Sequence, residues 1–366
     1  MKRIAPPSVE KVRLHFDESQ NQHSDNVAEG ISTVETQDDY LWLGFDESTT
    51  VERLKRTEEG YGEHQQFRLA DFVEMHAPDE DEMDIEGLCV YGGYLYVCGS
   101  HSSKRGKVDP EDPVREQVKT LQKIELDHNR YSFVRIPVTH DEDGELTLVK
   151  KTKDGRRAQR LKSNKWNSQL SEALESDEHL APYMDIPSKE NGFDIEGLGV
   201  FGTRIFLGLR GPVIGSFSLI LEIQLKSTKK KKLKLAKIGR KKARYRKHFV
   251  DLYGMGIREI QINESSGDFY ILAGPTMNLD GQISVFRIPQ GLPDEVESVT
   301  HKDGLERLCD ITKDEELAFN VDKAEGIAYL GDNQFIVVYD SPSEERRLEG
   351  DDVYADIVTL PAPGDS

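Results

Sequence analysis

Four glutamates, each followed directly by a glycine, are the residues of this sequence whose recurrence could support chemistry. They are Glu29, Glu86, Glu196 and Glu325, and a fifth similar segment carries Arg258 in place of the glutamate. Carboxylates that share one site repel one another, so a cation or an arginine must compensate their charge. A set of oxygen ligands suits Ca²⁺ or Mg²⁺, whereas a mixture of carboxylates and arginines suits a phosphate-bearing ligand.

Each glutamate lies in a repeated pattern: an acidic residue, the Glu-Gly pair, an apolar run, a turn, a second apolar run and a small polar cluster. The copies start near residues 25, 84, 194, 256 and 322. Two short apolar runs around a turn of Gly, Asn or Asp predict a β-hairpin. Further strand-like runs follow most copies, at residues 123–126, 131–136, 219–223, 244–249 and 282–288. Four strands per repeat are typical of one blade of a β-propeller.

The sequence therefore predicts an all-β fold, a β-propeller with five recognisable Glu-Gly blades of four antiparallel strands in a single domain over residues 8–366. The interval of 110 residues between Glu86 and Glu196 leaves room for a sixth blade. The spacing of Leu170, Leu174 and Leu180 instead favours an insertion over residues 141–190, with a helix near residues 164–184. Residues 353–358 are expected to close the ring by pairing with residues 12–16. The alternative architecture is a β-sandwich in which the Glu-Gly pairs recur by coincidence.

In a propeller blade the innermost strand starts at the same end at which the second strand finishes. The glutamates and the polar clusters should therefore converge on one mouth of the central channel. The predicted ligand-binding residues are Glu29, Glu86, His101, Lys104, Arg105, Glu196, Arg210, Arg258, Glu325 and Asp340, with Asp46 beside them. Glu29, Glu86, Glu196 and Glu325 are also the candidate metal ligands. The structural alternative is that these glutamates accept backbone N–H groups and fasten neighbouring blades, while the glycines allow close approach of the inner strands.

Several strings in this chain resemble a bacterial β-propeller family known only as domain of unknown function 3616. The matching strings are residues 86–88 with 99–105, 191–198 with 208–212, 245–249, 256–258, 272–277, and 324–327 with 339–342. The resemblance covers nearly the whole chain and implies a propeller distantly similar to phytase-like and esterase-like ones. It implies no particular activity.

Composition excludes several other classes. The start of the sequence turns polar early and no window is apolar enough to span a bilayer, so a cytosolic location without membrane contact is expected. The three cysteines argue against a disulfide framework and against a structural zinc site. The net charge of −19 argues against a general nucleic-acid surface. Residues 226–247 hold thirteen Lys or Arg and no acidic residue, and the stretch 226–248 is expected to form a basic hairpin within a blade, where an acidic partner or RNA would bind.

Two functions fit these observations. The favoured one is a binding or scaffold module that holds a small anionic ligand or a protein partner at the channel mouth without turnover. The alternative is a metal-dependent hydrolase of phosphoesters or lactones, in which the carboxylates hold Ca²⁺ or Mg²⁺ and the ion activates water. Arg258 favours the first, because an arginine weakens the negative field that a metal needs. The fold by itself cannot decide between them.

Overall fold

The computed structural model describes residues 3–17, 19–20, 30–77, 82–229, 232–277, 279, 281–311 and 321–361 of the chain. Each copy of the repeat forms an antiparallel hairpin, as predicted. In the second copy β6 (Ile85–Tyr91) turns at Gly92 and Gly93, both with positive φ, which glycine adopts at little cost, and returns as β7 (Tyr94–Gly99). The other hairpins are β2 (Ile31–Gln37) with β3 (Tyr40–Phe45), β13 (Asp194–Phe201) with β14 (Arg204–Gly211), β19 (Gly256–Ile262) with β20 (Phe269–Gly274), and β24 (Lys323–Gly331) with β25 (Gln334–Asp340).

Outer strands extend each hairpin into a sheet. They are β4 (Thr50–Thr57) and β5 (Gly60–Arg68); β10 (Phe133–His140) with β11 (Leu146–Leu148) and β12 (Gln159–Arg160); β15 (Phe217–Ile223), β18 (Arg246–Asp251) and β22 (Glu297–Thr300); β21 (Ser284–Ile288) and β23 (Glu306–Asp310); and β26 (Val353–Thr359) with β1 (Ser8–Leu14).

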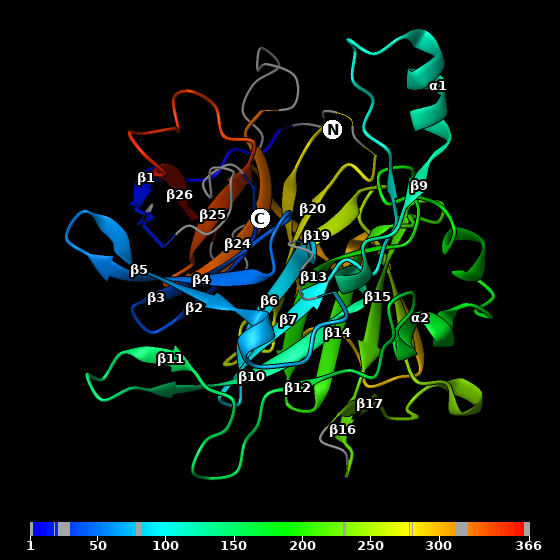
Figure 1. The fold of residues 1–366 in the computed structure, drawn as a ribbon, viewed down its shortest axis with the longest axis horizontal. Coiled ribbons are helices and arrows are strands. Elements are labelled where there is room, and N and C mark those ends of the chain that lie inside the picture. Colours follow the sequence, from blue (N-terminus) through cyan, green and yellow to red (C-terminus); the bar gives the residue numbers. More distant parts are fainter. Residues whose placement is uncertain are drawn as a thin grey trace.

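The innermost strands lie next to one another in a closed cycle: β2 contacts β6, β6 contacts β13, β13 contacts β19, β19 contacts β24, and β24 contacts β2 (Figure 1). Apolar side chains fill the space between neighbouring sheets. One cluster, for example, joins Trp42 of β3 to Leu88 of β6 and Ile136 of β10. Sheets that radiate from a ring of inner strands make the fold all-β and of the β-propeller type, as the repeat predicts.

The two ends of the described chain meet in one sheet. β1 pairs with β26 in antiparallel register from Ser8↔Thr359 to Leu14↔Val353. The same strand pairs in parallel with β5 at Arg13↔Gly60, which joins the first and last sheets. The prediction that residues 353–358 pair with an N-terminal strand is confirmed, although that strand spans Ser8–Leu14 and not residues 12–16.

Two expectations for the longer connections were wrong in detail. The helix expected over residues 164–184 is the short α2 (Gln169–Leu174), capped by Ser168, and a 3₁₀ turn follows at Ala181–Tyr183. Residues 123–126 do not form a third strand of the second sheet. β9 (Ile124–Glu125) pairs instead with β8 (Lys104–Arg105), and the two carry the helix α1 (Val114–Gln122) on a projecting arm (Figure 1).

The basic segment contains the hairpin β16 (Leu225–Ser227) and β17 (Leu233–Leu235), whose strands form a separate two-stranded sheet. Cys89, Cys98 and Cys309 are buried and unpaired. None of the helices that the structure describes is both long enough and apolar enough to cross a membrane.

Candidate ligand-binding site at the channel mouth

A β-bulge interrupts every innermost strand near its start. The register skips one residue between Ile85 and Gly87 in β6, and the same skip occurs in the other four inner strands. The skipped residues are Ser32, Glu86, Glu196, Arg258 and Glu325. Because a bulge re-aims the side chain of the extra residue, these five positions form one structural set at one end of the ring, which is called the mouth below.

The strand register shows that a different residue from the predicted one occupies the bulge position in the first copy of the repeat. Glu29 was expected at this position, but Ser32 occupies it, because Ile31 pairs with Phe45 as Ile85 pairs with Gly99. Glu29 lies outside the described residues. The Ser32 hydroxyl donates a hydrogen bond to the carbonyl oxygen of Ile85 in the next inner strand. The sequence comparison aligned Glu29 with the bulge position, which lies three residues further on. It did so because Ser32-Thr33 does not resemble the Glu-Gly pair of the other copies.

The glycine after each bulged glutamate lies where the neighbouring inner strand approaches. A Cβ at Gly87 would lie 2.6 Å from the Cβ of Leu198, and one at Gly326 would lie 3.0 Å from the backbone nitrogen of Val34. Both distances fit the interpretation that glycine permits close approach at the ring.

One part of the mouth, the neutral half, consists of Glu196, Arg210, Arg258 and Glu325. Arg210 Nη1 donates to Glu196 Oε1 at 2.7 Å, and Arg258 Nη1 donates to Glu325 Oε2 and lies 4.0 Å from Glu196 Oε2. All are buried or nearly so: Glu196 is 2% and Arg258 3% exposed. Burial raises the pKa of Glu196, while Arg210 and Arg258 oppose the shift. The two positive and two negative formal charges cancel.

The other part, the acidic half, consists of Asp46, Asp84, Glu86 and Asp194. One carboxylate oxygen from each of Asp46, Asp84 and Glu86 lies within 4.8 Å of the other two. Asp46 directly follows β3 of the first sheet, whereas Asp84 directly precedes β6 of the next sheet and Glu86 is the second residue of that strand. Burial is the main reason that the pKa values of Asp46 and Glu86 are raised well above normal, and the charge of Asp84 raises both further.

Asp194 has the same place in β13 that Asp84 has before β6. It is 2% exposed, and its Oδ1 makes no hydrogen bond to any residue that the structure describes. Burial and the charges of Glu196 and Asp84 raise its pKa, although Arg210 and Arg130 oppose the shift. A buried carboxylate oxygen without a partner is costly, and a protonated carboxyl group or a bound cation would remove that cost.

Further charged groups surround these two halves. The pKa of Asp340 is raised by burial and by the charge of Glu325. Burial lowers the pKa of Lys323, although Glu325 and Asp340 oppose the shift. Lys189 is exposed at the surface, and its pKa is raised overall. Partial desolvation lowers the pKa of Lys189, but the negative charge of Asp46 and of other carboxylates outweighs that effect. Lys189 therefore remains a cation beside the acidic half.

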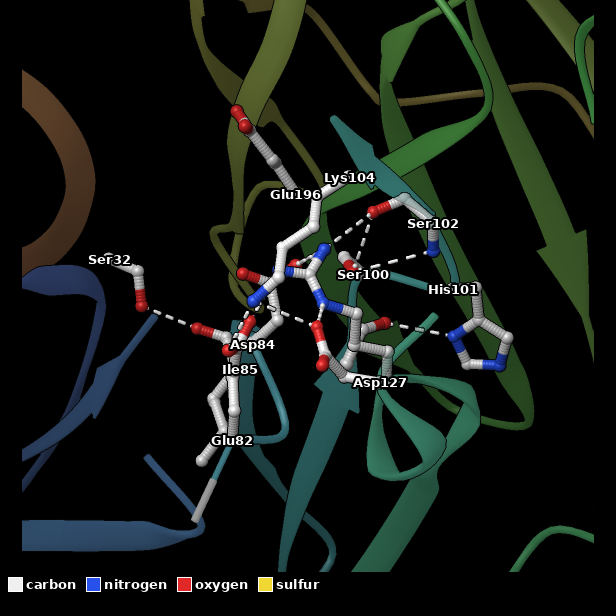
Figure 2. Close-up of polar contacts among 12 residues, drawn as sticks. Ser32, Glu82, Asp84, Ile85, Ser100, His101, Ser102, Lys104, Asp127 and Glu196 are labelled. Atoms are coloured by element: carbon white, nitrogen blue, oxygen red, sulfur yellow. Dashed lines mark hydrogen bonds and ion pairs between the residues drawn. The ribbon is translucent and has the colours of Figure 1, made fainter. Parts of the chain in front are cut away.

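Lys104 and Arg105 lie outside the mouth. Lys104 Nζ binds Glu82 at 2.5 Å and Asp127 at 2.9 Å, in the network that also surrounds Asp84 (Figure 2). Arg105 forms a bidentate pair with Glu190 at 2.7 and 2.8 Å.

His101 is also directed away from the mouth. Its Nδ1 lies 2.9 Å from the Gly99 carbonyl oxygen and its ring packs edge-on against Tyr131. Figure 2 shows the ring on the side away from Asp84. Burial lowers the pKa of His101 to about 4, so the imidazole is neutral at physiological pH.

Of the residues predicted from sequence, the mouth thus brings together Glu86, Glu196, Arg210, Arg258, Glu325, Asp340 and Asp46. Sequence reasoning missed Asp84, Asp194 and Lys189. For the two aspartates a signal was present, because an acidic residue stands two positions before the glutamate in Asp84-Ile85-Glu86 and Asp194-Ile195-Glu196. Lys189 comes from the long connection before β13 and no repeat marks it.

Asp84 itself is held by a further residue that the repeat does not mark. Arg130 Nη1 binds Asp84 Oδ2 at 2.8 Å and Arg130 Nη2 binds Glu82 at 2.6 Å. Arg130 is 5% exposed and therefore holds Asp84 in place from a buried position.

The fold and the mouth define a β-propeller with a cluster of charged residues at one end of its ring of inner strands. The chain belongs to the family described as "Protein of unknown function (DUF3616)", whose model matches residues 30–356. No curated protein matches the chain.

The solved structures that match this chain share little sequence with it. Hydrazine synthase of Kuenenia stuttgartiensis has a TM-score of 0.34 and 10% identity over 93% of this chain, which spans 65% of that chain. Glutaminyl cyclase of Myxococcus xanthus has a TM-score of 0.38 and 8% identity over 98% of both chains. The β-propeller domain of Cps50 (Swd1) from Myceliophteria thermophila has a TM-score of 0.35 and 7% identity, over 92% of this chain and 99% of that one. These similarities carry no functional information.

Proposed function

We propose that the mouth binds a divalent cation in its acidic half and, through that cation, a small anionic ligand. The observation that carries the proposal is the convergence of Asp46, Asp84 and Glu86 from two sheets, with their oxygens within 4.8 Å of one another. Oxygens bound to one Ca²⁺ at about 2.4 Å can lie up to about 4.8 Å apart, so three carboxylate oxygens within 4.8 Å of one another are compatible with one bound Ca²⁺.

The electrostatics of the acidic half support a cation. Raised pKa values at Asp46, Glu86 and Asp194 mean that the protein resists ionising these groups together. A divalent cation reverses that preference, because it stabilises the ionised form of each ligand. In the sequence, the presence of Arg258 was a reason to doubt a metal site. In the structure Arg258 binds Glu325 and lies 4.0 Å from Glu196, both in the neutral half, and it does not pair with the acidic half.

The anionic ligand is inferred from the coordination positions of the cation that the three carboxylates leave unfilled. A divalent ion coordinated by three carboxylates retains coordination positions, and a phosphate or carboxylate oxygen is a ligand that Ca²⁺ accepts. Lys189 lies on the exposed side of the same cluster and keeps its positive charge. Lysine binds phosphate as a point charge. A phosphorylated or carboxylated small molecule therefore fits the mouth.

Thermal unfolding with and without divalent ions tests the cation. Protein stripped with a chelator should gain several degrees of melting temperature in Ca²⁺, since a bound ligand at about 100 times its Kd contributes about 2.7 kcal/mol. Glu86→Gln and Asp84→Asn should each lose most of this shift. Asp39→Asn, an exposed carboxylate elsewhere on the first sheet, should keep it. Equal shifts in all three variants, or none in the wild type, would refute the cation site.

Hydrolysis is the second candidate, and Asp194 is the observation that favours it. A buried carboxyl group with a raised pKa beside a metal site can hold a proton for a leaving group, while the metal activates water. Turnover of a simple phosphomonoester or lactone that depends on Ca²⁺ and is lost in Asp194→Asn would support it. Ligand-induced stabilisation without turnover supports binding alone.

The closed cycle of inner strands supports a propeller of five blades, with β1 completing the last one. The basic segment 226–247 supports a secondary contact with an acidic macromolecule. The three buried, unpaired cysteines support a cytosolic location, because disulfides are rare there.

A further inference from the structure

Exposed apolar side chains gather in two places on this chain. Fourteen large apolar residues of the described part are exposed, and half of them lie either on the arm of residues 104–126 or on and beside β22. They are Val114, Val118, Leu121, Ile124 and Leu126 on the arm, and Val296 and Val299 at β22. Contiguous exposed apolar surface marks an interaction site more often than scattered residues do.

The helix α1 of the arm has one apolar side and no buried residue. Val114, Val118 and Leu121 follow the i, i+4, i+7 spacing of a helix stripe and are 76%, 49% and 54% exposed. Arg115 and Lys119 lie beside that stripe at helical spacing. Lys119 forms an exposed ion pair with Glu116 at 2.7 Å, which docking would exchange for a carboxylate of the partner. The carbonyl oxygen of Leu121 accepts a hydrogen bond from Arg105, so the helix is attached through β8 and stands away from the body (Figure 1).

The second surface is an open hollow of about 530 Å³ over the paired strands β18 and β22, called the edge groove below. Its lining residues are Glu178, His179, Phe249, Pro293, Glu295, Glu297, Ser298 and Val299. Apolar groups form part of it, and Val299 is 55% exposed. β22 is the outermost strand of its sheet and pairs only with β18 among the described strands.

The edge groove is negatively charged. Three carboxylates line it and no lysine or arginine does. Glu297 lies 3.7 Å from Arg240 and 3.8 Å from Lys247, whereas no cation of the described residues comes within ion-pair distance of Glu178 or Glu295. An apolar surface with two uncompensated carboxylates fits a partner that presents apolar and cationic groups together.

We propose that α1 of one copy of this chain docks in the edge groove of a second copy. Val118 and Leu121 would cover Phe249 and Val299, and Arg115 and Lys119 would pair with Glu178 and Glu295. Both surfaces stay exposed within a single chain, so one copy covers neither of them. Reciprocal exchange of two arms produces a closed dimer, the commonest symmetric assembly. This inference is independent of the cation at the mouth.

Charge reversal on each surface is the test, with the molar mass measured by light scattering over a dilution series. The wild type should form dimers at low salt and dissociate at about 1 M salt, where the Debye length falls to about 3 Å. Lys119→Glu and Glu295→Lys should each raise the dimer Kd at least about tenfold, equivalent to about 1.4 kcal/mol. The double variant carrying both changes should recover dimerisation within about threefold of the wild type, because the pair is restored with opposite sign.

Controls separate this contact from others. Lys153→Glu changes the net charge equally at an exposed site away from both surfaces and should leave the dimer intact. Leu121→Asp should abolish the dimer and leave the melting temperature of the monomer, measured at about 1 M salt, unchanged. A monomer at every salt concentration overturns the proposal. So does a dimer that Leu121→Asp disrupts but Glu295→Lys does not, which would indicate pairing of α1 with α1. Sedimentation of the monomer with anionic vesicles, abolished by Leu121→Asp, would assign α1 to a lipid surface instead.

Discussion

The two halves of the mouth are built from equivalent positions of the repeat but reach different electrostatic states. In the neutral half Glu196 and Glu325 each have an arginine, and the four buried charges cancel. In the acidic half Asp46, Asp84 and Glu86 crowd one another, and Arg130 holds only Asp84. Position in the repeat therefore determines where a side chain points, while the identity of its neighbours across the ring determines its charge.

This difference in pairing suits the neutral half to stabilising the fold and the acidic half to binding a ligand. Buried charges that are paired contribute rigidity and expose little unmet charge to a ligand. Carboxylates that are not paired destabilise the fold in the absence of a ligand, and that cost is recovered when a cation binds. We expect substitutions in the two halves to change stability in opposite directions.

The largest effect is expected when the neutral half loses its shared arginine. Arg258→Ala leaves Glu325 and Glu196 buried beside an empty position, and breaking a buried pair in this way costs about 3–5 kcal/mol. Arg258→Glu should cost more, and millimolar Ca²⁺ should partly rescue that variant, since the neutral half would then resemble the acidic half. Urea unfolding measures both changes.

The matched control for Arg258 is Arg56→Ala, which removes an exposed arginine and should change stability by less than about 0.5 kcal/mol. If both Arg258 variants unfold within the range of this control, the neutral half does not stabilise the fold and the comparison fails.

A smaller effect of opposite sign is expected in the acidic half. The folded-state pKa of Glu86 is raised above its unfolded value, so the folded protein binds more protons between the two values and loses stability as pH rises. Without divalent ions, Glu86→Gln should therefore stabilise the protein at neutral pH. As pH rises above the ordinary glutamate pKa of 4.5, its melting temperature should also fall less steeply than that of the wild type.

The slope of melting temperature against pH shows how much Glu86 contributes to the pH dependence of stability. Glu35, another buried carboxyl group with a pKa raised to about 8, contributes in the same direction, so the slope should shrink in Glu86→Gln without vanishing. A Glu86→Gln protein that is less stable than the wild type in chelator would show that Glu86 is paired in solution, which would contradict the distinction between the halves.

The smallest effect is expected at the boundary between the halves. Ser32 occupies the bulge position between those of Glu325 and Glu86, and its hydroxyl donates to the Ile85 carbonyl. Ser32→Ala should cost about 1 kcal/mol, the usual net contribution of one hydrogen bond. It should leave the Ca²⁺-induced shift in melting temperature unchanged. A loss of that shift would extend the acidic half to the first inner strand.

Much of the fold was predictable because its signal is periodic. Apolar runs separated by turn residues recur in each copy, and they mark the hairpins from β2–β3 to β24–β25 independently of their surroundings. The closing strand was also predictable, since a propeller must satisfy the free edge of its last sheet. The arm of residues 104–126 was not, because Val114, Val118 and Leu121 form too short a stripe to distinguish from loop.

The mouth was predictable in its location and only partly in its members. Glu86, Glu196, Glu325 and Arg258 follow from the repeat, because a bulge at a constant position aims them alike. His101 follows the same strand end and yet turns to the Gly99 carbonyl, which the positive φ of 57° at His101 permits and no sequence pattern reveals. Which carboxylates lack a partner depends on contacts between sheets.

The pairing of β1 with β26 has a consequence for how the molecule is made. Leu14 and its partner Val353 lie about 340 residues apart in the chain. At a synthesis rate of about 5–20 residues per second, β1 leaves the ribosome roughly 20–70 s before β26 exists. During that interval its available partner in the sheet is β5, which pairs with only its last two residues, Arg13 and Leu14. The nascent chain therefore spends most of its synthesis as an open arc with one exposed strand edge, and that edge is where misassembly would begin.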